Sequence, residues 1–224
     1  MKFVVALVLA VAVSQPAFAQ EPDPVATARQ ELEAVMAREG LVRELAGMGA
    51  MDQLVRQRFL AARLNASEED RERLEVEAWP IAEAVDQANT ARIREILAGH
   101  EGWFPISQFG RSASEAAYSV VQHSGDLDLM RDVLSRMEPR VGTDELNGSQ
   151  YARLWDRTAL MDGRPQRYAT QGTACEGGRY VMPTNVEDPR MLEARRAYLG
   201  LNPMSEYLAH QNQTYGRCTQ SEGK

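Results

Sequence analysis

The chain is patterned for helices from residue 25 onward. Its first apolar stripe repeats every three or four residues with charged residues between, which is the spacing of one helix face. Gly47 and Gly49 interrupt this pattern, and a second stripe follows over 51–64. We therefore expect two amphipathic helices, separated by the glycines. The residues of the two stripes are Leu32, Val35, Met36, Leu41, Leu45, Leu54, Val55, Phe59 and Leu60.

Proline and capping signals divide the rest of the chain. Pro80 lies within a charged helical pattern over 68–97, and proline disrupts a helix interior, so we expect a kink or break near Trp79. Residues 112–115 (SASE) form a capping box, which predicts a helix start after a loop over 99–111. Further helices are expected over 112–124, 127–137, from Thr143 to about 160, 188–198 and from 203 onward.

One segment is patterned for strands. Residues 163–171 (GRPQRYATQ) begin with a turn and then alternate, with polar side chains on both sides. Gly177 and Gly178 offer a bend, and 180–182 can return as the second strand. The sequence thus predicts a small antiparallel β-hairpin over 165–184. The expected fold class is mainly α: a single helical domain, residues 25–215, with one small antiparallel β-hairpin.

The first 19 residues predict a secretory signal peptide. One lysine precedes an apolar run from Phe3 to Val13, and Ala17-Phe18-Ala19 provides an A-x-A cleavage site. The apolar run is shorter than the roughly 20 residues that span a bilayer. We therefore expect export, to the periplasm or the medium, with Gln20 at the mature N-terminus.

Charge and cysteine content narrow the class of protein further. The net charge is −7, and an acidic exported protein is not expected to bind nucleic acid. No later segment is apolar for long enough to predict a membrane span. Cys175 and Cys218 are the two cysteines, and in an oxidising compartment such a pair most often forms a disulfide.

A series of short motifs resembles a known family. The motifs are MDQ-x-x-R (51–56), GW-x-P (102–105), QH (122–123), L-x-D-R (154–157), G-x-x-Q-x-Y-x-T-Q (163–171) and RR-x-x-LGL (195–201), followed by Tyr207. In this order, over about residues 45–210, they resemble the DUF6624 family, an uncharacterised and largely bacterial domain family. The resemblance implies no known reaction, substrate or cofactor.

The chain departs from the family pattern at two places. Phe104 intervenes where GWP is expected, and Ala169 stands where the family has the glycine of YGTQ. Alanine adopts a positive φ less readily than glycine. We therefore expect a more regular strand at Ala169.

His123 is the first candidate for chemistry. It ends a helix whose small apolar residues predict burial, and Gln122 precedes it. His123 is either a C-terminal helix residue bonded to a neighbour or a general acid/base, since imidazole exchanges protons near neutral pH. In the catalytic interpretation Asp156 orients His123, and Gln122 contacts the ligand.

Polar residues further along the chain are candidates for ligand binding. Arg157 either pairs with a carboxylate such as Asp52 or Glu115, or binds an anionic group through its forked donors. Gln166 and Tyr168 share a face of the predicted strand. With Gln171, they either position a ligand in a polar cleft or satisfy buried backbone groups.

The sequence leaves two functions open. It has no H-E-x-x-H motif and no CxxC motif, and its three histidines are far apart, so no metal or other cofactor is predicted. The first function is binding of a small polar or anionic ligand by the His/Asp/Arg/Gln cluster. The alternative is a cell-envelope hydrolase or transferase with His123 as general acid/base.

Overall fold

The computed structural model describes residues 23–216 and residue 218. The predicted signal peptide lies outside the described residues. The chain divides into two units, residues 1–37 and 38–224, and the predicted domain over 25–215 spans their boundary. In the described part of the chain, no helix is long and apolar enough to cross a membrane.

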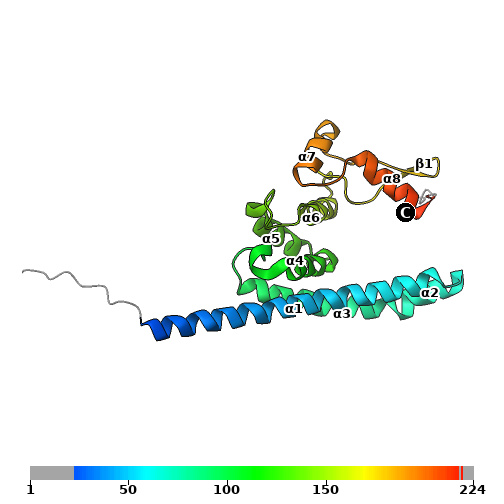
Figure 1. Cartoon of the computed structure of the whole chain (residues 1–224). Coiled ribbons are helices and arrows are strands. Elements are labelled where there is room, and N and C mark those ends of the chain that lie inside the picture. The colour runs from blue at the N-terminus through cyan, green and yellow to red at the C-terminus, as the bar shows by residue number, and fades with distance from the viewer. Residues whose placement is uncertain (1–22, 217, 219–224) are drawn as a thin grey trace, which may run out of the picture. The chain divides into compact units, whose positions relative to one another are not determined.

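Helices make up most of the described chain, as predicted, together with one two-stranded antiparallel sheet. Figure 1 shows them in order from blue to red. The helices are α1 (Pro24–Leu64), α2 (Glu68–Glu77), α3 (Trp79–Ala98), α4 (Ile106–His123), α5 (Leu127–Met137), α6 (Gly148–Met161), α7 (Leu192–Tyr198) and α8 (Met204–Tyr215). The strands are β1 (Ala174–Glu176) and β2 (Arg179–Val181), and short 3₁₀ turns cover Glu138–Arg140 and Pro189–Met191.

The first unit contributes the N-terminal part of α1. Among the described residues of this unit, the large apolar side chains are exposed, from 45% for Val35 to 73% for Met36. The stripe of an amphipathic helix is expected to face a core, and this expectation is wrong for Leu32, Val35 and Met36.

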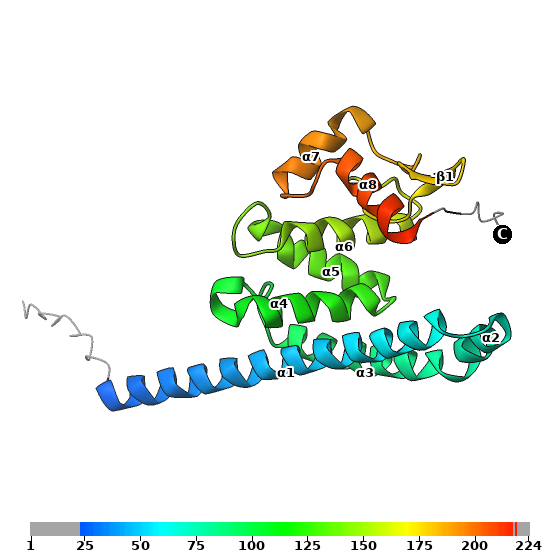
Figure 2. The same ribbon diagram turned by 45° about the vertical axis from the view of Figure 1, so that its right-hand side comes forward.

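In the second unit the helices form layers. Both views place α4, α5 and α6 between α3 and the C-terminal helices α7 and α8 (Figure 2). The main core lies around α4 and includes the fully buried side chains of Phe104, Val121, Met130 and Leu154. A smaller cluster at α7 and α8 contains Ala169, Val186, Leu192 and Met204.

Helix α1 continues through the two glycines where a break is predicted. Its buried residues are Leu45, Gly49 and Asp52, whereas Leu54 and Leu60 of the predicted stripe are 46% and 52% exposed. A side chain at Gly49 would place its Cβ 2.4 Å from that of Ala116 on α4. Gly49 is therefore required by the close packing of α1 against α4, which the sequence pattern does not reveal.

Other helix boundaries agree with the sequence in part. The predicted break near Trp79 is confirmed, since α2 ends at Glu77 and Pro80 lies in the first turn of α3. Helix α4 begins before the predicted capping box but is interrupted by a non-helical Gly110. The cap of α6 is Asn147 rather than Thr143, because the Asn147 side chain accepts from the Ser149 amide.

The hairpin is shorter than predicted. Its strands pair Ala174 with Val181 across the expected Gly177–Gly178 bend, and Cys175 is bonded to Cys218. Residues 166–171 form a loop, joined to Val186 through a single bridge at Gln166. Ala169 has φ +53°, so the expectation of a regular strand there is wrong.

Candidate functional site

His123 is the last residue of α4, and its ring contacts a carboxylate from α1. Nδ1 lies 2.9 and 3.0 Å from the two carboxylate oxygens of Asp52. Because a carboxylate only accepts hydrogen bonds, Nδ1 carries a proton and donates it. The Asp52 side chain is fully buried, whereas that of His123 is 25% exposed. The pair thus links a solvent-excluded carboxylate to an imidazole at the surface.

The Asp52 carboxylate is held by two further donors. Gln53 Nε2 donates to Oδ2 at 2.9 Å, and Arg56 Nη1 donates to Oδ1 at 2.5 Å. Arg56 Nη2 also bonds both carboxylate oxygens of Asp86 on α3, at 2.7 and 2.6 Å. A buried charge is costly unless it is paired and hydrogen-bonded. These contacts explain how Asp52 can be buried, and they connect α1, α3 and α4 around His123.

The second ring nitrogen of His123 is left free for other chemistry. Within the described residues, Nε2 has no hydrogen-bond partner. With the proton fixed on Nδ1, neutral His123 presents a lone pair at Nε2, and the protonated ring presents a donor there. The arrangement can accept a proton from a bound molecule or give one to it.

Gln122 and Arg157 each have a buried polar atom without a partner. Gln122 is buried and its Oε1 has no hydrogen bond, and Nε of the half-buried Arg157 also has none among the described residues. The predicted pairing of Arg157 with Asp52 or Glu115 is wrong. Asp52 bonds Arg56 and His123, and Glu115 accepts from Asn147 Nδ2 at 3.0 Å.

Asp156 lies in α6 and holds the loop that follows this helix. Oδ1 accepts from the amides of Arg167 and Tyr168 at 2.7 and 3.0 Å, and Oδ2 accepts from the amide and hydroxyl of Thr170, each at 2.8 Å. Burial raises the pKa of the Asp156 carboxyl, and the four hydrogen bonds act in the opposite direction. The carboxylate that orients His123 is therefore Asp52, and Asp156 fixes the backbone.

Gln166 and Gln171 close the same loop on itself. Gln166 Nε2 donates to the carbonyl oxygen of Gln171 at 2.8 Å, and Gln166 Oε1 accepts from the Gln171 amide at 2.9 Å. Gln166 is buried, so both ends of its amide group are satisfied within the loop. In the structure these glutamines serve backbone groups, which is the second of the two roles considered for them.

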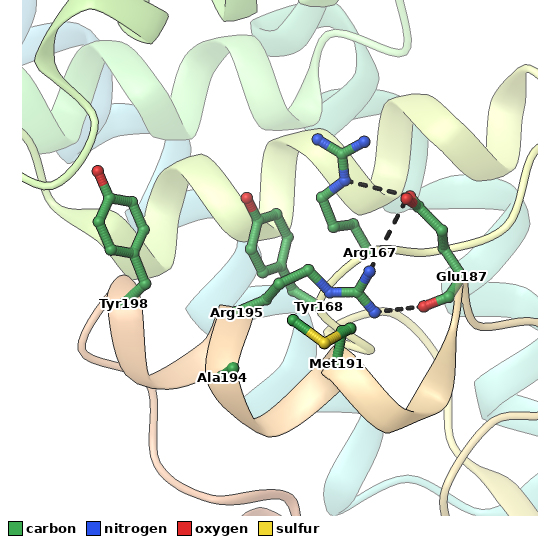
Figure 3. Close-up of a pocket in the computed structure, with 7 residues that line it drawn as sticks. All are labelled: Arg167, Tyr168, Glu187, Met191, Ala194, Arg195 and Tyr198. Carbon is green, nitrogen blue, oxygen red and sulfur yellow. Dashed lines mark hydrogen bonds and ion pairs between the residues drawn. The ribbon is translucent and has the colours of Figure 1, made fainter.

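Tyr168 lines a pocket of about 400 Å³ (Figure 3). Burial raises the pKa of Tyr168 to about 12, so its hydroxyl keeps its proton at neutral pH. Arg167 Nε donates to Glu187 at 3.1 Å, and Arg195 Nη1 lies 3.8 Å from the other carboxylate oxygen of Glu187. The Glu187 carboxylate therefore neutralises part of the positive charge of Arg167 and Arg195. The complete lining is Arg167, Tyr168, Glu187, Met191, Ala194, Arg195 and Tyr198.

The predicted site residues thus occupy separate places. His123 contacts Asp52, while Asp156, Gln166, Tyr168 and Gln171 gather in and around one loop. The sequence prediction does not include Asp52 among the site residues. The signal that could have identified it is its helical spacing from Leu45 and Gly49, which places it on the buried face of α1. In the part of the chain described by the structure, no group of three or more His, Cys, Asp or Glu residues could hold a metal ion.

Comparison with known proteins gives one match. The sequence model of a family of unknown function, DUF6624, matches residues 39–220. No curated protein and no solved structure matches the chain.

Proposed function

The chain belongs to DUF6624, a family of unknown function, and we propose that His123 and Asp52 form the functional centre of this protein. At this centre, Nε2 of His123 exchanges a proton with a small polar ligand. One observation carries this proposal. A fully buried carboxylate holds Nδ1 of a partly exposed histidine, whose Nε2 has no partner among the described residues. With Nδ1 fixed by Asp52, Nε2 is the atom at which the ring can accept or donate a proton.

The roles of the residues follow from their contacts. His123 takes a proton from an attacking water or hydroxyl group and returns it to the leaving group, as a hydrolase or transferase requires. Asp52 fixes the ring and stabilises the positive charge that His123 acquires. Arg56 holds Asp52 through Nη1 and is itself anchored to Asp86. Arg56 is thus a positioning residue.

Binding without catalysis is a second candidate function. It is favoured by the pocket at Tyr168, where Arg167 and Arg195 share the Glu187 carboxylate. In this case the protein would hold a small polar or anionic ligand in the pocket at Tyr168 without turnover, and the His123–Asp52 pair would only connect α1 and α4.

Turnover of a substrate panel separates these functions. The mature protein, residues 20–224, would be assayed with ester, phosphoester and amide substrates. For any substrate that it hydrolyses, we expect His123→Gln to lower kcat at least about 100-fold without a large change in melting temperature. Asp128→Asn, which changes an 84% exposed side chain of α5, is the control. Unchanged kcat in His123→Gln would refute the catalytic role, and binding without turnover would favour the second function.

We also propose that the protein is exported. The predicted leader, residues 1–19, supports this proposal, as does the disulfide between Cys175 and Cys218. Expression of the full chain in a bacterium, followed by fractionation and N-terminal sequencing, tests it. We expect a product in the periplasm or medium that begins at Gln20. A cytoplasmic product with an intact N-terminus would contradict it.

A further inference from the structure

A second pocket, of about 500 Å³, lies between α6, α7 and α8. Its wall contains two arginines from different helices, Arg153 of α6 and Arg196 of α7, together with Thr170, Tyr207 and His210. None of these residues belongs to the His123 centre. The volume is in the range of pockets that hold small organic molecules.

Arg196 is unusual because it is buried without a direct ion pair, and the carboxylates of Glu193 and Asp156 act on its charge only from a distance. It is 2% exposed, yet its side chain bonds only neutral groups: Nε donates to the Asn202 carbonyl at 2.9 Å, and Nη1 donates to the Tyr168 carbonyl at 2.6 Å. Its guanidinium carbon also lies 5.3 Å from the Tyr207 ring centre. Among the described residues it forms no ion pair, whereas its neighbour Arg195 contacts Glu187.

Burying a charge is costly unless the charge is paired and hydrogen-bonded, and Arg196 has hydrogen bonds but no direct ion pair. Burial lowers the pKa of Arg196, but a guanidinium remains charged in proteins. Nη2 of Arg196 has no hydrogen-bond partner in the described part of the chain. The residue thus brings a positive charge and unused donors to the wall of a pocket.

Arg153 brings a second positive charge to the same pocket. It is exposed, and its guanidinium has no ion pair within the described residues. Glu206 supplies one negative charge to the lining, so the two arginines leave an excess of one positive charge. A planar fork of N–H donors matches the oxygens of carboxylate and phosphate groups.

We propose that this pocket binds a small organic anion through a carboxylate or phosphate group held by Arg153 and Arg196. The aromatic ring of Tyr207 and the amide of Gln211 line the remainder of the pocket and would contact the body of the ligand. The site is independent of the acid/base role proposed for His123.

Thermal unfolding of the mature protein with defined anions tests this site. Inorganic phosphate and succinate are the probes, and chloride at equal ionic strength is the reference. We expect one or both probes to raise the melting temperature above the reference, because a ligand of the folded state stabilises it. A rise with phosphate alone assigns a tetrahedral group, and a rise with succinate alone assigns a carboxylate. No rise with either probe overturns the proposal.

Variants locate the binding within the molecule. Arg153→Gln should weaken binding of the active probe about tenfold, the effect of losing one charge-assisted hydrogen bond, and Arg196→Lys should weaken it similarly. Arg190→Gln is the matched control, since it removes an arginine charge in the 3₁₀ turn Pro189–Met191, where the Arg190 side chain is 89% exposed. His123→Gln should leave binding unchanged. If Arg196→Lys does not fold, Arg153→Gln decides: binding equal to that of wild type would refute the site.

Discussion

Gly49 determines how closely α1 approaches α4. A Cβ at this position would lie 2.4 Å from Ala116 Cβ and 2.7 Å from its Cα, closer than packed carbon atoms allow. Gly47, two residues earlier in the same helix, has nothing within 4 Å of the corresponding position. One glycine is thus required by packing, and the other carries only the low helix propensity of glycine.

The two glycines give opposite predictions for one substitution. Gly49→Ala should lower the free energy of unfolding by about 1–3 kcal/mol, since overpacking displaces a neighbouring helix. Gly47→Ala should raise it by up to about 1 kcal/mol, because alanine favours the helix. Urea unfolding of both variants measures the difference. Equal stability of the two would contradict the close approach of α1 and α4.

At the scale of elements, Asp156 attaches the 166–171 loop to α6. Each of its oxygens accepts two hydrogen bonds from the loop. In Asp156→Asn, an amide NH₂ would face two of these donors. We expect the free energy of unfolding to fall by about 2–4 kcal/mol, with faster hydrogen exchange at the amides of Arg167, Tyr168 and Thr170.

Asp128→Asn is the control for this prediction. Asp128 is 84% exposed and pairs with Arg131 on the same helix, so its loss should cost less than about 1 kcal/mol. If Asp156→Asn lowered the free energy of unfolding no more than Asp128→Asn does, the loop would not depend on the four hydrogen bonds.

The helices could be predicted from the sequence more reliably than this loop. Periodicity and Pro80 indicate most of the helical elements, since they depend on local geometry. The alternation in residues 166–171 is typical of a strand, but Gln166 uses its side chain to bond the backbone of Gln171. Ala169 adopts a positive φ in this loop while its methyl group is buried beside Val186. Tertiary contacts of this kind leave no periodic signal.

At the scale of the whole molecule, the disulfide closes a long segment of chain. Cys175 in β1 and Cys218 are separated by 43 residues, and α7 and α8 lie between them. The bond restricts the unfolded chain, so the double variant Cys175→Ser/Cys218→Ser should lose about 2–4 kcal/mol of unfolding free energy. Urea unfolding with and without a reductant measures this loss.

The reductant also supplies the control for the disulfide. It should lower the unfolding midpoint of the wild type to that of the double variant and leave the double variant unchanged. An unchanged wild-type midpoint under reducing conditions would show that the bond contributes little to stability.

The candidate site depends on contacts that the sequence shows least clearly. His123 stands out because of its residue type, but its partner Asp52 lies 71 residues earlier in the chain. Asp156 also lies on the buried face of its helix, and the spacing of Asp52 along α1 does not show which helix it contacts. Only the packing of α1 against α4 identifies Asp52 as the partner of His123, because it brings Ala116 against Gly49 and His123 against Asp52.

The protonation of the His123 ring tests the central claim most directly. The ¹⁵N chemical shifts of its two ring nitrogens would be measured by NMR in the mature protein and assigned by comparison with His123→Gln. The hydrogen bond from Nδ1 to Asp52 predicts that neutral His123 carries its proton on Nδ1 and leaves Nε2 bare. A neutral ring with the proton on Nε2 would contradict the hydrogen bond and the proposed acid/base centre together.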